Sequence, residues 1–336
     1  MKTVSIVIPC LNEKEYIFRC LQSIVKQRYP QNLITTFICD GGSNDGTIDI
    51  IQEFIKTNSG FVLVHNPQKT TPYALNLGIK ASTSDIVIIL GAHSELDPGF
   101  VECNVNTFQI DANIMCAGGV IDNVYENHTS QIIGAAMSSS FGVGNAHFRT
   151  GTKSGFVDTV AFGAYKKEIF EAVGLFDEEL IRNQDDEFNY RVTNAGYKIY
   201  LNQDIKCNYF VRASFRKLFK QYYQYGYWKV FVNKKHKTIT TIRQLIPLFF
   251  VLYLALWVTS SLINSTVFAF LGVFGIIYLV LAFTFAIQKS KSLIPMLGIV
   301  YTFFILHFSY GSGYLKGIFD FFIIGKSIKK YESLSR

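Results

Sequence analysis

The sequence predicts an α/β domain built on a mostly parallel sheet and followed by a carboxyl-terminal region of transmembrane helices. In the first part of the chain, short β-rich runs alternate with stretches of helical periodicity, which calls for a parallel sheet with helices on its faces. The last part changes character, because no residue is charged from Leu245 through Gln288 or from Ser292 through Leu315. Uncharged stretches of this length are typical of segments that cross a bilayer.

The expected strands and helices alternate in order along the amino-terminal part. The strands are expected at Val4–Ile8, Thr35–Cys39, Phe61–His65 and Asp85–Leu90. The intervening helices are expected at Glu15–Gln27, Thr47–Lys56 and Tyr73–Ala81. Apolar spacing distinguishes the two kinds of element, and the short strands bounded by turn residues suit a buried sheet.

An acidic segment broken by glycines, Asp40–Thr47, follows the second expected strand directly. It places a carboxylate and several backbone N–H groups at the carboxyl end of a parallel sheet, where open α/β sheets bind nucleotides. A simpler interpretation is a strand-to-helix turn in which Asn44 and Asp45 cap the next helix. The segment by itself leaves both interpretations open.

The uncharged tail divides into four apolar segments. They are Ile246–Ile263, Val267–Ile287, Leu293–Phe308 and Tyr314–Ile324, within a membrane region predicted over residues 244–326. The first two are long enough to span, whereas the last two, separated by Gly311–Gly313, fall at or below the roughly 17–25 residues that a spanning helix needs. The last two are therefore expected to form a tilted pair or a re-entrant hairpin.

Basic residues cluster beside the apolar segments. The clusters are Lys234–Lys237 with Arg243, then Lys289 and Lys291, then Lys326, Lys329 and Lys330. The positive-inside rule places these connections and the amino-terminal domain in the cytoplasm, which predicts a multi-pass protein of the plasma (inner) membrane. An anionic bilayer also explains the net charge of +7, so no nucleic-acid partner is expected.

Several motifs, taken in order, resemble a known enzyme family. Val4–Glu13, Asp40–Thr47 and Asn76–Gly78, with Ala81 and Asp85, resemble successive signatures of the family 2 glycosyltransferases, which have the GT-A fold. Within that family the chain resembles membrane-anchored polysaccharide members such as the succinoglycan-pathway glucosyltransferases. The resemblance implies a GT-A domain over residues 1–235.

The resemblance implies a nucleotide site at the ends of the first two strands. Pro9, Asn12 and Glu13 occupy the positions where the family contacts the nucleotide, and Asp40 the position whose carboxylate bonds the uracil or ribose. The alternative is that Asn12 and Glu13 only cap the helix that follows them.

The family usually ends its fourth strand with Asp-x-Asp, whose carboxylates hold Mn²⁺ or Mg²⁺ on the sugar diphosphate. Here the matching positions are Gly91, Ala92 and His93. Imidazole is an acceptable ligand for manganese-like ions, so His93 is the candidate ligand for a divalent cation. The alternative is a histidine that closes the strand with a backbone hydrogen bond.

A second acidic segment resembles the acceptor side of the family. Gly174–Glu178, then Gln184–Arg191, then Gly196 and Tyr197 resemble the run that ends in the family's Glu-Asp pair, with Gln184 in place of the Glu. Asp185 falls on the catalytic base, the carboxylate that takes the proton from the acceptor hydroxyl. Asp186 and Glu187 either raise the pKa of Asp185 by repulsion or are solvated, and all three acids also suit the first turn of a helix.

Aromatic and basic residues alternate in Phe215–Lys229, directly before the membrane segments. This composition predicts an interfacial helix near residues 214–229, which suits membrane lipids and a polyprenyl-diphosphate acceptor. Processive synthases of the family carry Gln-x-x-Arg-Trp here, whereas this chain has Gln221 followed by Gln224 and Tyr225.

These expectations combine into one function. The chain is predicted to be an inverting hexosyltransferase that moves sugar from a nucleotide-diphospho sugar, expected to be UDP-linked, to a lipid-linked glycan for a surface polysaccharide. Three alternatives stay open: a transferase acting on polyprenyl phosphate itself, a processive synthase, or an inactive membrane-anchored binding subunit.

Overall fold

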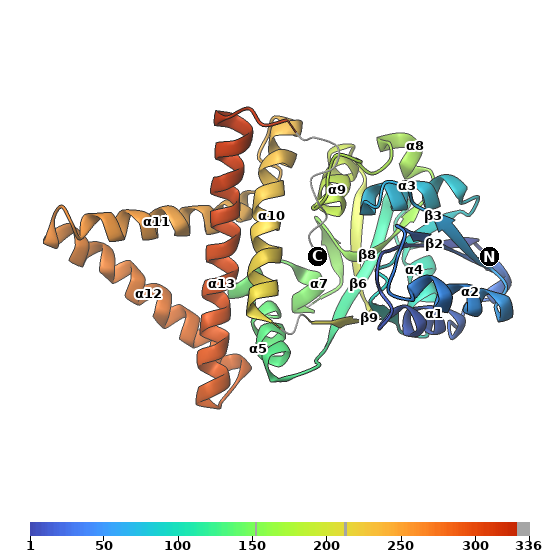
Figure 1. The fold of residues 1–336 in the computed structure, drawn as a ribbon, viewed down its shortest axis with the longest axis horizontal. Coiled ribbons are helices and arrows are strands. Elements are labelled where there is room, and N and C mark those ends of the chain that lie inside the picture. The colour runs from blue at the N-terminus through green and yellow to red at the C-terminus, as the bar shows by residue number, and fades with distance from the viewer. Residues whose placement is uncertain (152, 212–213, 328–336) are drawn as a thin grey trace. The chain divides into compact units, whose positions relative to one another are not determined.

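The computed structural model describes residues 1–151, 153–211 and 214–327, which form two compact units. The first unit comprises Met1–Val124 and His147–Phe210. The second comprises Tyr125–Ala146 and the described residues from Val211 to 327. The chain therefore leaves the first unit and returns to it before entering the long carboxyl-terminal part of the second (Figure 1).

The predicted strands form the parallel half of one sheet in the first unit. Its strands are β1 (Val4–Cys10), β2 (Ile34–Asp40), β3 (Phe61–His65) and β4 (Ile86–Ile89), in the order β3-β2-β1-β4. The helices between them are α1 (Ile17–Val25), α2 (Thr47–Thr57) and α3 (Thr71–Ala81). The alternation of strand and helix expected for this part is confirmed, with boundaries shifted by a few residues.

The other half of the sheet is mixed. Its strands are β5 (Ser94–Leu96), β6 (Ile114–Val124), β7 (Gly155–Val157), β8 (Ala161–Lys166) and β9 (Lys198–Phe210), and they continue the order as β8-β6-β9-β5, with β7 also on β9. The helices of this half are α4 (Phe100–Thr107), α7 (His147–Thr150), α8 (Ile169–Val173) and α9 (Gln184–Asn194). Antiparallel β8 joins the two halves by pairing with β4 on one side and β6 on the other.

The helices hold to the sheet through one apolar face each. Helix α1 buries Ile17, Leu21 and Ile24 completely, since these residues recur at helical spacing on the side that faces the sheet. In α3, a Cβ at Gly78 would lie 2.4 Å from a methyl group of Val7, so only glycine permits this close approach to β1. The carboxyl ends of β1 to β4 are thereby fixed at a common edge.

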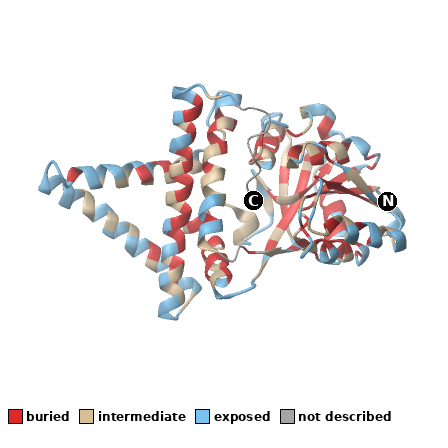
Figure 2. Cartoon of the chain, viewed as in Figure 1, coloured by how far each residue is buried: buried red, intermediate tan, exposed pale blue. Residues whose placement is uncertain are grey.

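The second unit is helical. Its helices are α5 (His128–Met137), α6 (Ser140–Val143), α10 (Phe215–His236), α11 (Ile246–Ser260), α12 (Ser265–Lys289) and α13 (Leu293–Ile318), with a π-helical turn at Phe319–Ile323. Helices α10 and α13 run side by side, while α11 and α12 leave this pair as a hairpin (Figure 1). Both arms of the hairpin expose many apolar side chains, among them Phe249, Leu256, Phe270 and Ile276 (Figure 2).

Three helices of the described residues are long and apolar enough to cross a membrane: Ile242–Ser260, Ser265–Lys289 and Leu293–Ile323. The expected first and second spans correspond to α11 and α12. The third and fourth expected segments are a single helix, so the prediction of a tilted pair or a re-entrant hairpin is wrong. Of the third basic cluster, Lys329 and Lys330 lie outside the described residues.

The glycines that suggested a break are helix-packing positions instead. A Cβ at Gly311 would lie 2.0 Å from the carbonyl oxygen of Pro247 in α11, and one at Gly313 would lie 2.0 Å from that of Tyr223 in α10. Small residues let apolar helices approach to backbone contact, and the packing offsets the low helix propensity of glycine. Gly226 of α10 makes the reciprocal approach to α13.

The predicted interfacial helix corresponds to α10, which extends from Phe215 to His236. It packs along α13 within the second unit, with Trp228 and Val230 buried. The structure thus divides the chain after Phe210, whereas the sequence placed the end of the first domain near residue 235.

Candidate functional site

Two loops at the carboxyl edge of the sheet are tied together by Asn12. Its backbone N–H donates to Ser43 Oγ at 2.8 Å, and its Oδ1 accepts from the N–H of Asn44 at 2.9 Å. Asn12 adopts a left-handed conformation with φ of 55°, which asparagine tolerates better than most residues. The ends of β1 and β2 therefore form one continuous rim, and Pro9 lies inside it, in register with Cys39 of β2.

Asp40 builds the turn after β2. Its side chain is almost fully buried, and its Oδ2 accepts from the N–H groups of Gly42 at 2.7 Å and Ser43 at 2.9 Å. Oδ1 accepts from Ser43 Oγ at 2.5 Å. The carboxylate thus shapes the rim itself, and its bond to a nucleotide stays a prediction.

Asp45 lies two residues before α2 and hydrogen-bonds to the first residue of that helix. Its Oδ1 accepts from the N–H of Thr47 at 3.0 Å, and its Oδ2 from the N–H of Lys14 at 3.2 Å. Burial raises the pKa of Asp45, but these hydrogen bonds outweigh burial and lower it overall. The N-cap residue of α2 is Gly46, which makes no side-chain cap, so neither Asn44 nor Asp45 is the cap itself. Asp45 accepts from the first N–H of the helix from one residue before the cap, while the N–H of Asn44 donates to Asn12.

Glu13 and His93 meet at the same edge. Nδ1 of His93 lies 3.4 Å from Oε1 of Glu13, whose side chain is 8% exposed, while the imidazole is 40% exposed. The backbone N–H of Glu13 donates to Thr47 Oγ1 at 2.9 Å. Tyr16, not Asn12 or Glu13, is the N-cap residue of α1, and that cap has no side-chain hydrogen bond.

The edge beside His93 is aromatic. The ring of Tyr16 lies 6.4 Å from the imidazole and that of Tyr209 lies 6.0 Å from it, both edge-to-face. Tyr209 comes from β9, whose register sets it opposite Ser94 of β5. These rings leave part of the imidazole open to solvent.

The described residues contain no group of three or more His, Cys, Asp or Glu side chains that could hold a metal ion. Among Gly91, Ala92 and His93, which stand where the family carries Asp-x-Asp, Ala92 is buried in the core. A cation at His93 would accordingly share its coordination with oxygen atoms of a substrate, as Mg²⁺ commonly does with phosphates.

Asp185 lies on a different element, exposed in the first turn of α9. Glu187 is neither solvated nor a free like charge, because it is buried and paired with Arg191, whose Nε donates to Oε1 at 2.8 Å. One turn after Asp185, Asn189 is fully buried and accepts from the hydroxyl of Tyr165 at 3.1 Å. These contacts fix α9 against β8 and leave Asp185 at its exposed end.

The charge of Asp185 influences the buried Tyr165 of β8. Burial raises the pKa of Tyr165 well above its usual value, and the negative charge of Asp185 adds to the increase. Asp185 is within electrostatic range of Tyr165 on the antiparallel strand β8. The other predicted site residues lie at the ends of β1 and β2 (Pro9 and Asp40) or in the loops after β1 and β4 (Asn12, Glu13 and His93).

A family model described as glycosyl transferase family 2 matches residues 5–174, half of the chain. The chain belongs to this family. It is 34% identical over 242 residues, covering 70% of this chain and 75% of the relative, to a dolichyl N-acetyl-α-D-glucosaminyl phosphate 3-β-D-2,3-diacetamido-2,3-dideoxy-β-D-glucuronosyltransferase of Methanococcus voltae. It is 27% identical to succinoglycan biosynthesis protein ExoA of Rhizobium meliloti, over 94% of this chain and 95% of the relative.

The fold of this family 2 glycosyltransferase has a solved counterpart. The mannosyltransferase PcManGT of Pyrobaculum calidifontis, in complex with GDP-Man and Mn²⁺, superimposes with a TM-score of 0.68 at 17% identity, covering 95% of this chain and 88% of the other. The GT-A fold expected from the motifs is therefore confirmed, and the protein is a glycosyltransferase with candidate transmembrane helices after its first unit.

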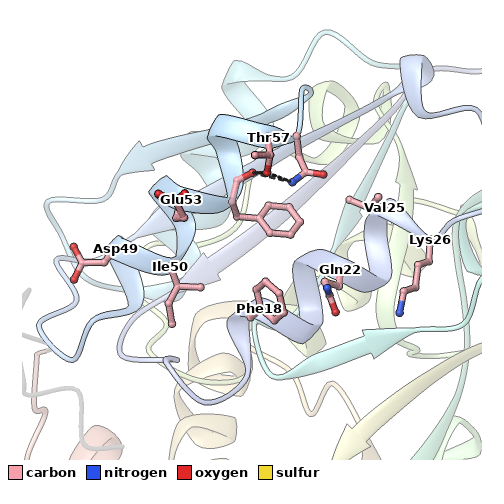
Figure 3. Close-up of a pocket in the computed structure, with 10 residues that line it drawn as sticks. Phe18, Gln22, Val25, Lys26, Asp49, Ile50, Glu53 and Thr57 are labelled. Atoms are coloured by element: carbon pink, nitrogen blue, oxygen red, sulfur yellow. Dashed lines mark hydrogen bonds between the residues drawn. The ribbon is translucent and has the colours of Figure 1, made fainter.

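A surface groove of about 680 Å³ lies elsewhere on the glycosyltransferase, between the outer faces of α1 and α2 (Figure 3). Phe18, Gln22 and Val25 line one wall, with Asp49, Ile50 and Glu53 opposite. Because α1 turns Ile17, Leu21 and Ile24 to the sheet, this groove is on the side of α1 away from the strands. None of the predicted site residues lines it.

The aromatic residues beside His93 in this glycosyltransferase are not predictable from local sequence. Tyr16 lies only three residues after Glu13, but no local pattern distinguishes it from a packing residue. Tyr209 reaches the site only through the pairing of β9 with β5, which short-range periodicity cannot reveal.

Proposed function

We propose that this glycosyltransferase moves a hexose, with inversion, from a nucleotide-diphospho sugar to a lipid-linked glycan acceptor in the synthesis of a surface polysaccharide. The observation that supports it best is the paired Glu13 and His93 on the rim that Asn12 closes, at the sheet edge where α/β folds bind nucleotides. One relative acts on a dolichyl-linked sugar phosphate and another serves succinoglycan synthesis, by their names.

The proposed reaction is a single displacement. The acceptor oxygen forms a bond to the anomeric carbon while the bond from that carbon to the diphosphate oxygen breaks, and the electron pair stays on the departing diphosphate. Asp185, exposed at the amino end of α9, takes the acceptor's proton as general base. We expect the nucleotide to be uridine, with Asp40, Pro9, Asn12 and Glu13 forming its side of the site.

The residues present fit a divalent cation, Mn²⁺ or Mg²⁺, that is shared with the donor's phosphates. Histidine ligands commonly bond a carboxylate through their second ring nitrogen, which fixes the tautomer, and Glu13 is placed to do this for His93. Such a cation neutralises charge on the diphosphate. Glu13 then has a second role, holding the imidazole with Nε2 as its free lone pair.

The sequence of α10 bears on whether the enzyme adds one sugar or many. In α10, Gln221 donates to the hydroxyl of Tyr225 at 2.9 Å, within the second unit. Gln221 thus packs within its own helix at the position where processive synthases carry their motif. Because Gln224 and Tyr225 stand where processive synthases carry Arg and Trp, we favour transfer of single sugars over processive synthesis.

Incubating membranes that contain the protein with a panel of nucleotide sugars and lipid-linked acceptors tests the function directly. Mass spectrometry should detect one added hexose on the glycan lipid, and NMR of the product should show an anomeric configuration opposite to that of the donor. A ladder of many added sugars would favour a processive synthase. No transfer from any donor would contradict the proposal.

We also propose that α11 and α12 cross the membrane as a hairpin and that α13 lies along its cytoplasmic surface beside α10. Two crossings return the chain to one side, which leaves Arg243, Lys289 and Lys326 together as the positive-inside rule requires. A third crossing by α13 would separate Lys326 from the others. The apolar window of α13 is also 39% buried against protein, compared with 11% for α11 and for α12.

Labelling of single introduced cysteines tests this topology. In intact cells an impermeant maleimide should label Ser265→Cys, at the start of α12, but neither Ser292→Cys before α13 nor Ser327→Cys after it. All three positions are exposed, and the unsubstituted protein serves as the control because five of its six cysteines are buried. Labelling of Ser327→Cys from outside would make α13 a third span.

A further inference from the structure

Arg149 stands beside the predicted site on a surface of aromatic rings. Its guanidinium carbon lies 5.4 Å from the centre of the Phe148 ring and 5.4 Å from that of Tyr209. Helix α7, which carries Arg149, packs against β6 within the first unit. The side chain is partly buried, so these contacts hold its charge in a defined place.

The same tyrosine connects Arg149 to His93. The centre of the Tyr209 ring lies 5.4 Å from the guanidinium carbon and 6.0 Å from the centre of the imidazole. The ring lies near the carboxyl end of β4 because Tyr209 of β9 pairs with Ser94, the residue that follows His93. A cation from a segment far away in the sequence is thus brought next to the candidate metal ligand.

Stacking on aromatic faces suits an arginine that binds a phosphate. The guanidinium carbon lies over both rings, and a guanidinium carries five N–H donors in a planar fork that matches phosphate oxygens. Lysine has no such planar fork. This edge of the sheet also lacks both carboxylates of Asp-x-Asp, since Gly91 and His93 replace them, so an anionic ligand meets less negative charge here.

We propose that Arg149 binds a phosphate group of a substrate and stabilises its negative charge during sugar transfer. Two sources have this chemistry: the diphosphate of the nucleotide sugar and the phosphate that links the acceptor glycan to its lipid. In the first case, the electron pair of the broken anomeric bond passes to the diphosphate, whose oxygens accept from the N–H groups of Arg149. The inference rests on the proposed function and adds a residue to it.

Calorimetry on the full-length protein in detergent tests the donor source, with UDP and uridine as probes. Arg149→Ala should weaken UDP binding by roughly 10- to 100-fold, the range for a hydrogen bond to a charged group, and leave uridine binding unchanged. Arg149→Lys should recover only part of the loss, because it restores charge but not the fork. Lys153→Ala, an exposed cation four residues away, is the matched control and should bind both probes normally.

Steady-state kinetics separate the two sources. If the acceptor supplies the phosphate, Arg149→Ala should keep UDP affinity but raise KM for the lipid-linked acceptor by a similar factor, with no change for an acceptor that lacks phosphate. Equal weakening of UDP and uridine, or unchanged values in both experiments, would overturn the proposal. A wild-type protein that transfers no sugar would contradict the proposed function itself, whereas transfer that is insensitive to Arg149→Lys and Arg149→Ala contradicts only the role of Arg149.

Discussion

Replacement of Asp185 by asparagine should lower the rate of sugar transfer by ~10²–10⁴-fold, the usual contribution of general base catalysis. The amide keeps the shape of the side chain but cannot take the proton of the acceptor hydroxyl. Nucleotide affinity should change little, because Asp185 stands on α9, apart from the loops that carry Asn12 and Asp40. Turnover numbers and UDP affinities of purified variants give this comparison.

The neighbouring acids provide the control. Asp186 lies in the same helical turn, so Asp186→Asn removes a similar charge from the same dipole and should leave the rate within a few-fold of wild type. Glu187 does not serve this purpose because its pairing with Arg191 supports the fold of the region. Near-normal turnover of Asp185→Asn, or a larger loss in Asp186→Asn, would move the base to another residue.

Replacement of His93 by alanine should raise the Mn²⁺ concentration needed for half-maximal activity by about tenfold or more, since even residues that only support a ligand change metal affinity by 10- to 100-fold. His93→Asp restores an oxygen ligand and should keep activity, with better use of Mg²⁺. Glu13→Gln should produce an intermediate effect, because it weakens only the partner of the imidazole. Mn²⁺ titrations at saturating donor, with calorimetry of Mn²⁺ in the presence of UDP, measure these shifts.

Full activity of the wild-type protein in excess chelator would contradict the metal role of His93. The substituted proteins must also retain the fold for the comparison to hold. His93 is partly exposed and sits outside the apolar core, so its replacement should leave the melting temperature nearly unchanged. A large drop in melting temperature for His93→Ala would instead indicate that the imidazole mainly packs between Tyr16 and Tyr209.

Local sequence predicted the parallel half of the sheet well. Strands β1 to β4 are short apolar runs separated by helices of regular spacing, so each element is specified by its own residues. The loops that form the rim were also predictable, because Asp40 and its glycines come directly after a buried strand. The strand-to-helix turn was one of the two interpretations that the sequence left open, but the hydrogen bonds that Asp40 accepts within that turn were not predicted.

The mixed half of the sheet and the site residues from it depend on contacts between distant segments. Strands β6 and β9 pair with register shifts near Gly118 and Gly119, which interrupt the alternation that identifies a strand. A Cβ at Gly119 would lie 1.7 Å from the carbonyl oxygen of Ile205, a requirement visible only when both strands are in place. Tyr209 joins the site through the pairing of β9 with β5, and Arg149 through the packing of α7 against β6, so no local motif identified either residue.

The continuity of α13 escaped prediction for a related reason. Gly311-Ser312-Gly313 has the composition of a turn, and only the closeness of Pro247 and Tyr223 explains glycine inside a helix. Helix propensity is a weak guide where neighbouring helices decide the packing.

Helix α5 gives the chain an unusual order of assembly during translation. Its apolar residues Ile132 and Ala136 pack with Ala282 of α12 and Phe303 of α13, all within the second unit. At 5–20 residues per second, a ribosome needs on the order of ten seconds to proceed from α5 to these partners. The strands before and after α5 in the sequence can pair during this time. The apolar face of α5 stays unpacked until α12 and α13 have been synthesised. A stop codon between Phe210 and Ala282 would therefore leave α5 without its packing partners beside a sheet whose own strands are all present.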